Sequence, residues 1–162
     1  PEVYERGISA VTFATQRMND GTRGATAKIG NYLVSVLALR AARAAGAAEA
    51  LIVDGEGHVV EGATSNVFFV KEGVLVTPPE EAGILPGITR ATLLELAVDA
   101  EIPVELRAPR LGELPTFDEA FISSSIRELV AAVDIDGVRV GSGAPGPVFR
   151  RLLAAFRVRA EG

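Results

Sequence analysis

The chain has 162 residues, of which 48% are hydrophobic and 23% are charged, and its net charge is −5. This hydrophobic content is enough for one buried core, and no run approaches the roughly 20 apolar residues of a membrane-spanning helix. The absence of a dense basic cluster argues against a nucleic-acid-binding protein. Without cysteine, and with His58 as the single histidine, a disulfide, a thiolate nucleophile or a histidine-rich metal site is not expected. Since the start of the chain does not resemble a signal peptide, we expect a cytoplasmic protein.

Apolar runs and turn residues alternate along the chain, which predicts one domain of mixed α and β type. A strand is predicted over residues 8–13, followed by a polar loop over 17–27 that presents Lys28. The alanine-rich segment from Asn31 to about Ala45 predicts a helix that stops near Gly46. Glycine-containing turns then separate four short strands into two hairpins. The downstream predictions are strands at 50–54, 58–61, 66–70, 74–77, 103–107, 119–123, 129–135 and 138–140, and helices at 89–100 and 147–159.

Lys28 is one of only two lysines in the chain, and it stands directly before the first predicted helix. Most lysines are solvated surface residues. A partly desolvated lysine, however, is the nucleophilic amine that an aldehyde cofactor needs. The other lysine, Lys71, lies next to Glu72 and Gly73 in a predicted exposed hairpin turn. Lys28 is therefore the candidate Schiff-base residue.

Two further segments complete a candidate site for pyridoxal phosphate. Glu61 ends a predicted strand, and a carboxylate beside a pyridine nitrogen favours the protonated form of that nitrogen. The segment 85–90 opens a predicted helix with Pro-Gly, which is either an ordinary helix-capping turn or a source of backbone N–H groups for a phosphate. The residues that offer these groups are Gly87, Ile88 and Thr89.

Together these segments resemble the class IV, fold-type IV aminotransferases, the group that contains branched-chain aminotransferases, D-amino-acid aminotransferases and aminodeoxychorismate lyase. The resemblance runs over nearly the whole chain. It implies a mixed α/β fold, the large C-terminal domain of a D-amino-acid aminotransferase-like enzyme, with a pseudo-barrel of strands, flanking helices and pyridoxal 5'-phosphate as cofactor. Four segments of the sequence support this resemblance, in this order along the chain: Lys28 with 31–33, Glu61-Gly62 with 65–68, 77–79, and 85–90.

The resemblance also implies roles for single residues. Lys28 forms the Schiff base with the cofactor and moves the substrate proton. Tyr32 lies near the phenolic oxygen of the cofactor, Glu61 faces the pyridine nitrogen, and Leu85 packs on the ring. The phosphate is bound by Gly87, Ile88, Thr89 and Ser125, although Ser125 also fits a serine-rich strand end that makes local turn bonds.

The residues that follow depart from the branched-chain pattern, which has small residues in place of Ile126 and Arg127. Both are candidate substrate contacts, and Arg127 either pairs with a substrate carboxylate or is a surface charge. The reaction is therefore open between amino transfer from an amino acid to a 2-oxo acid and the pyruvate-expelling reaction of aminodeoxychorismate lyase. The remaining alternative is a vestigial, non-catalytic module, against which the joint presence of Lys28, Glu61 and Thr89 argues.

Relatives of this family carry a smaller N-terminal domain that contributes a phosphate-binding arginine and one wall of the substrate pocket. Since the first predicted strand begins at residue 8, residues 1–162 are expected to be the C-terminal cofactor-binding domain alone. We expect the missing wall to come from an N-terminal domain or a partner chain, and the enzyme to be a homodimer, as is usual in the family. The choice between L and D substrates stays open, because residues outside this region largely determine it.

Overall fold

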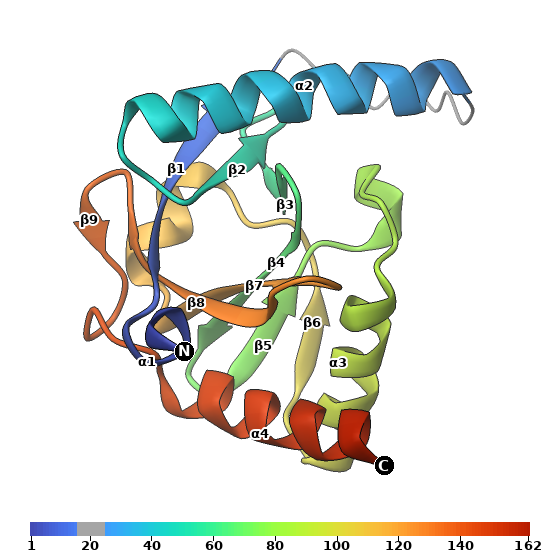
Figure 1. The fold of residues 1–162 in the computed structure, drawn as a ribbon, viewed down its shortest axis with the longest axis vertical. Helices are drawn as coiled ribbons and strands as arrows, with labels where there is room; N and C mark the ends of the chain where they lie inside the picture. The colour runs from blue at the N-terminus through green and yellow to red at the C-terminus, as the bar shows by residue number, and fades with distance from the viewer. Residues whose placement is uncertain (16–24) are drawn as a thin grey trace.

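The computed structural model describes residues 1–15 and 25–162, with side chains described for 1–15 and 32–162. Helices and strands of the described residues form one mixed α/β unit (Figure 1). Their order is α1 (Glu2–Arg6), β1 (Ile8–Ala14), α2 (Ala25–Ala44), β2 (Glu49–Val53), β3 (Val59–Gly62), β4 (Asn66–Lys71), β5 (Val74–Thr77), η1 (Glu80–Ala82), α3 (Ile88–Asp99), β6 (Val104–Leu106), η2 (Leu111–Thr116), β7 (Glu119–Ser124), β8 (Glu128–Ile135), β9 (Val138–Arg139) and α4 (Pro147–Glu161).

The strands form one curled sheet in the order β3-β2-β1-β8-β7-β4-β5-β6, with β9 paired to β8. β1 runs parallel to β2 and to β8, and β5 runs parallel to β6. The other neighbouring pairs are antiparallel. Parallel neighbours need a long crossover, and the connection from β1 to β2 contains α2. In Figure 1, α2 crosses one end of the curled sheet, whereas α3 and α4 cover its side and its opposite end.

Apolar side chains on both faces of the sheet hold the helices in place. Successive strand residues point to opposite faces, so Phe68 and Phe69 of β4 enter different cores. Phe69 packs with η2 and residues of β1, β2, β3, β5, β7 and β8. Phe68 packs with Phe121, Phe149 and the buried faces of α3 and α4. A third cluster joins α2, through residues such as Ala38, to β2 and β3. The three clusters fix the strand ends that carry the predicted site residues.

The predicted mixed α/β fold is confirmed, and each predicted strand appears within one residue of its predicted bounds at either end. Short apolar runs separated by glycine-containing turns carried this information. The helices α3 and α4 also match their predictions closely. The short helix α1 and the two 3-10 helices were not predicted; α1 has no buried residue, so no apolar pattern marks it.

The predicted start of α2 was wrong. The helix begins at Ala25 rather than at Asn31, so that Lys28 lies within the helix and not at the end of a loop. Alanine is the strongest helix former, whereas one glycine in a helix costs only about 1 kcal/mol. Gly30 therefore does not stop a helix that alanine-rich segments on both sides favour. Residues 17–24 of the predicted loop lie outside the described residues.

The cap of η2 gives a testable pH dependence. The Glu113 carboxylate accepts the backbone N–H of Arg110 at 2.7 Å and the guanidinium of Arg107 at 3.0 Å. The backbone hydrogen bond, and then Arg107, lower the pKa of Glu113 from its ordinary value of 4.5. A pKa that is lower in the folded protein adds stability above the unfolded-state value, and this stability is lost as the pH falls through the folded-state value.

We expect the variant Glu113→Gln to have a lower free energy of unfolding than the wild type at pH 7. The Glu113 side chain is 40% exposed, so solvent screening keeps the difference below about 1 kcal/mol. Thermal unfolding of both proteins between pH 7 and pH 3 checks this. The difference should shrink as the pH falls below about 4.5. A difference that stays constant with pH would show that the carboxylate charge contributes nothing.

Candidate functional site

Glu61 connects strand β3 to the segment before α3. It lies opposite Ile52 of β2, and its side chain is buried. Its Oε2 accepts the backbone N–H of Leu85 at 3.2 Å. The end of the β2–β3 hairpin therefore lies beside the N-terminus of α3. The structure thus brings together two groups that the sequence predicted from separate motifs: the carboxylate and the glycine-opened helix.

Asn66, at the start of β4, fixes the same segment from another side. Its Nδ2 donates to the carbonyl oxygen of Leu85 at 3.1 Å. Its Oδ1 is so near Gly87 that a Cβ atom there would lie 2.4 Å from it, which explains why this position is glycine. Asn66 belongs to a motif that suggested the family, yet it was not among the predicted site residues. A buried side-chain amide needs hydrogen-bond partners, and this requirement is the signal that could have marked Asn66 as a site residue.

The first turn of α3 contains one cation, Arg90, whose Nη1 lies 4.0 Å from Oε1 of Glu80. Its N-cap, Gly87, supplies no side-chain hydrogen bond, and the first N–H groups of a helix have no intrahelical acceptor. Ile88 is exposed and Thr89 is buried. The buried guanidinium of Arg90 donates from Nη2 to the carbonyl oxygen of Pro78 at 3.1 Å, while its Nε has no partner among the described residues. A buried cation beside a helix N-terminus favours an anion at this place.

Strand β7 contributes a second buried donor near this place. Ser123 lies directly opposite Asn66 of β4, so both side chains are on the same face of the sheet. Ser123 is 1% exposed, and its hydroxyl has no partner among the described residues. The sequence prediction did not include Ser123, because nothing in a serine-rich strand end distinguishes a buried hydroxyl from a solvated one.

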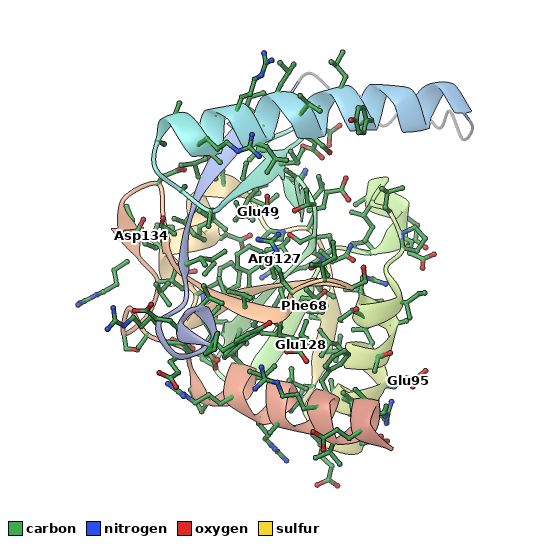
Figure 2. The ribbon with its side chains drawn as sticks, viewed as in Figure 1. Glu49, Phe68, Glu95, Arg127, Glu128 and Asp134 are labelled. Carbon is green, nitrogen blue, oxygen red and sulfur yellow. The ribbon has the colours of Figure 1, made fainter. Side chains whose placement is uncertain are left out.

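The turn between β7 and β8 holds Ser125, Ile126 and Arg127. Ser125 and Ile126 are exposed. The Arg127 Nη2 donates to Oε2 of Glu49 at 2.8 Å and to Oγ1 of Thr64 at 2.9 Å. Figure 2 shows Glu49 and Arg127 in the middle of the molecule, below α2. The alternative that Arg127 is merely a surface charge is therefore wrong, because a fully buried carboxylate pairs with it. A contact of Arg127 or Ile126 with substrate stays a prediction.

The remaining predicted residues are exposed or lie outside the described side chains. Tyr32 on α2 is 74% exposed and Leu85 is 55% exposed, so both are accessible to a cofactor, a substrate or another chain. Lys28 lies on α2, but its side chain is outside the described residues. Its position relative to Glu61 therefore stays a prediction. Lys71 ends β4 and is exposed, as the sequence predicted.

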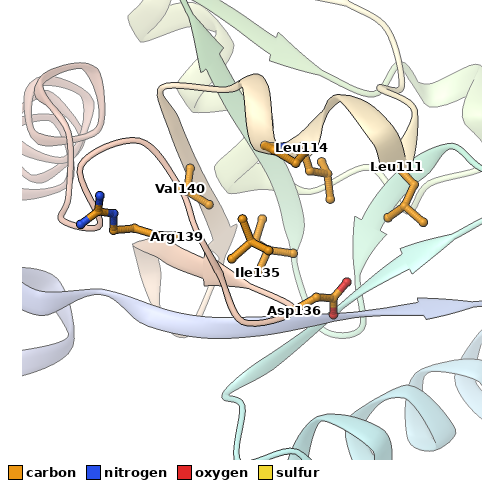
Figure 3. A pocket seen from close by; sticks show the side chains of 8 residues that line it. Leu111, Leu114, Ile135, Asp136, Arg139 and Val140 are labelled. Carbon is orange, nitrogen blue, oxygen red and sulfur yellow. The ribbon is translucent and has the colours of Figure 1, made fainter.

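A hollow of about 160 Å³ lies elsewhere, between η2 and the β8–β9 turn (Figure 3). Apolar side chains such as Leu114, Ile135 and Val140 line it, and no predicted site residue does. The hollow is therefore separate from the predicted cofactor site. Within residues 1–15 and 32–162, whose side chains are described, no group of three acidic, histidine or cysteine side chains is suited to a metal ion. In the same ranges no helix has the length and apolar character to span a membrane.

The chain is similar in sequence and in fold to known branched-chain aminotransferases. The branched-chain-amino-acid aminotransferase of Escherichia coli (strain K12) is 39% identical over 156 residues, which cover 96% of this chain and 50% of that protein. The crystal structure of the Escherichia coli branched-chain amino acid aminotransferase matches with a TM-score of 0.90 and 37% identity over 97% of this chain and 52% of that chain. The T.th. branched-chain amino acid aminotransferase, complexed with N-(5'-phosphopyridoxyl)-L-glutamate, matches with a TM-score of 0.87 and 34% identity over 96% of this chain and 52% of that chain.

The chain spans about half the length of these relatives. Its likeness to them covers nearly all of its own residues, so the predicted fold type is confirmed. The model of the family described as amino-transferase class IV matches residues 1–135. The chain therefore belongs to the class IV aminotransferase family.

Proposed function

We propose that this chain is the cofactor-binding part of a pyridoxal-phosphate-dependent aminotransferase that moves an amino group between a branched-chain amino acid and a 2-oxo acid. The observation that carries the proposal is the hydrogen bond between Glu61 and Leu85, which holds a buried carboxylate beside the N-terminus of α3. The names of the relatives and the phosphopyridoxyl compound bound by one of them support it.

The residues present fit this cofactor. Its phosphate needs several hydrogen-bond donors. The buried Arg90 Nε and Ser123 Oγ are donors without a partner among the described residues. Gly87 lets the first turn of α3 come close to Asn66, and this turn offers the N–H groups of Ile88 and Thr89. The proposed phosphate contacts are Gly87, Ile88, Thr89 and Ser125.

When bound, pyridoxal phosphate supplies an aldehyde that takes up the amino group and a protonated ring that accepts electrons. Lys28 would hold the cofactor through its Nζ, and the same amine would carry the proton of the substrate Cα. The Glu61 carboxylate holds a proton on the ring nitrogen, because a neighbouring negative charge favours the charged form. Leu85 would orient the ring by packing on it, and Tyr32 would face the phenolic oxygen.

The proposal includes a second part of the enzyme. An N-terminal domain or a separate chain completes the substrate pocket, excludes water and orients the substrate. The length of the relatives, about twice the matched region, supports this expectation. A homodimer and a cytoplasmic location belong to the same proposal.

Reductive labelling tests the proposed cofactor site. The full-length protein is incubated with pyridoxal phosphate and reduced with borohydride, and the modified residue is located by peptide mass spectrometry. We expect about one label per chain, confined to Lys28, since a Schiff-base lysine must be partly desolvated. Lys71 is exposed, so Lys71→Arg is the matched control and should label like the wild type. Labelling of Lys28→Arg at the wild-type level would contradict the proposal.

Product analysis tests the reaction. We expect amino-group transfer from a branched-chain amino acid to 2-oxoglutarate, followed as glutamate formation. The family alternative is aminodeoxychorismate lyase, which releases pyruvate and 4-aminobenzoate. Release of 4-aminobenzoate without glutamate formation would replace the aminotransferase assignment by the lyase assignment.

A further inference from the structure

Glu49, the first residue of β2, is a carboxylate with 0% exposed surface. A charge is stable in the interior only where donors surround it. Its Oε1 accepts the backbone N–H of Ala50 at 2.9 Å. Its Oε2 accepts the hydroxyls of Thr64 at 2.9 Å and Ser65 at 3.0 Å, and the guanidinium of Arg127 at 2.8 Å. We call these four side chains, Glu49, Thr64, Ser65 and Arg127, the Glu49 network.

The Glu49 network joins two segments that are far apart in the sequence. Its two hydroxyls belong to the loop between β3 and β4, which follows Glu61. Its arginine belongs to the β7–β8 turn, which carries Ser125. The Arg127 Nη2 also donates to Thr64 Oγ1 at 2.9 Å, so the turn and the loop are in direct contact. The network therefore connects the loop that follows the proposed ring-nitrogen residue to the turn that carries a proposed phosphate residue.

Other contacts hold the turn but do not replace this connection. The Tyr4 hydroxyl donates to the carbonyl oxygen of Arg127 at 3.1 Å, and Arg157 pairs with Glu128 at 3.0 Å. These contacts come from α1 and α4, which lie at the end of the molecule away from β3 (Figure 1). The chain at the start of the β3–β4 loop is packed closely against Glu49, since a Cβ atom at Gly62 would lie 3.2 Å from Oε2 of Glu49.

We propose that Glu49 is a positioning residue that acts through Arg127 and sets the distance between the Glu61 loop and the Ser125 turn. Because Glu49 pairs with the guanidinium, the positive charge of Arg127 is largely compensated within the protein. Arg127 therefore holds the two segments in position and does not attract a substrate carboxylate. This inference rests on the proposed function, since only a shared ligand makes the distance between the two segments matter.

Single variants should weaken ligand binding. Glu49→Gln keeps an oxygen acceptor for the hydroxyls but leaves the Arg127 charge without its partner. Arg127→Met removes the connection from the other side. A misplacement of about 1 Å in an active site can cost roughly 100-fold in rate. For either variant of the full-length protein we expect at least about a tenfold rise in the dissociation constant of pyridoxal phosphate or in the KM of the amino acid.

The double variant Glu49→Gln/Arg127→Met separates positioning from folding. Removing one member of a buried ion pair is strongly destabilising, whereas replacing both is often neutral. We therefore expect the Tm of the double variant to return close to that of the wild type, while the dissociation constant and KM stay raised. If binding recovers together with the Tm, the network serves folding alone and the inference is overturned.

A control ion pair and a competing role for Arg127 complete the test. The exposed pair of Glu95 and Arg159, at 2.9 Å, is the control, and Glu95→Gln/Arg159→Met should bind the cofactor like the wild type. If Arg127 contacts substrate directly, Glu49→Gln will lower the KM for glutamate and Arg127→Met will raise it for acidic substrates alone, which overturns the positioning role. A wild-type protein that takes up no pyridoxal phosphate overturns the proposed function, and this inference with it.

Discussion

Glu61→Gln is expected to slow proton removal from the substrate by at least about 100-fold, with a much smaller change in pyridoxal phosphate affinity. A glutamine keeps an oxygen that accepts the Leu85 N–H, now 3.2 Å from the carboxylate, so the segment before α3 stays in place. The neutral amide, however, cannot favour the protonated ring nitrogen as a carboxylate does. Removing one preorganised electrostatic group in an active site typically costs roughly 100- to 1,000-fold in rate.

Single-turnover kinetics in the full-length enzyme measure this effect. The half-reaction with a branched-chain amino acid is followed by the absorbance of the cofactor, and loss of the Cα deuteron is followed in parallel. Glu56→Gln, on the same hairpin and with a side chain that is 85% exposed, is the control and should react like the wild type. An unchanged rate of deuteron loss in Glu61→Gln would contradict the role proposed for Glu61.

The strands were predictable because the residues that specify each strand and its turn are close together in the sequence. In β4 and β5, short apolar runs flank a Lys-Glu-Gly turn, and in the structure Glu72 and Gly73 adopt the positive φ values of 51° and 80° that a tight hairpin turn uses. The start of α2 was not predictable in the same way. Glycine and polar residues around 17–30 are typical of a loop, whereas helix propensity from Ala25 and Ala27 prevails locally.

The candidate site was predictable only where a motif marks it. Glu61, Leu85 and the residues that open α3 belong to recognisable segments, and the structure brings these segments together. The Glu49 network was missed because Glu49 and Arg127 are 78 positions apart. A glutamate at the start of a strand is usually solvated, and only the structure shows that all five residues of β2 are buried. Pairing over such a separation follows from topology, which the order of local elements does not determine.

The core behind the proposed phosphate site should respond most strongly to Phe121→Ala. The Phe121 side chain is 0% exposed. Its ring stacks on Phe68 with centroids 5.1 Å apart, and it lies 5.6 Å from the ring of Phe149 on α4. Truncation removes both ring contacts and leaves a cavity that the sheet and α4 cannot close, so we expect a loss of about 3–5 kcal/mol in the free energy of unfolding.

Urea unfolding of the wild type and the variant measures this loss, with equal m-values as the condition for comparing them. Phe156→Ala is the matched control, because Phe156 is only partly buried at the edge of the same cluster, and its loss should be clearly smaller. Total stabilities of single domains are about 5–15 kcal/mol, so Phe121→Ala will unfold a measurable fraction of the protein at moderate temperature. Below that temperature its folded fraction should still bind pyridoxal phosphate, since Phe121 packs among the core residues of α3 and α4 and is not a proposed cofactor contact. A loss below about 1 kcal/mol would mean that α4 shifts to fill the space, and that the sheet does not depend on this aromatic stack.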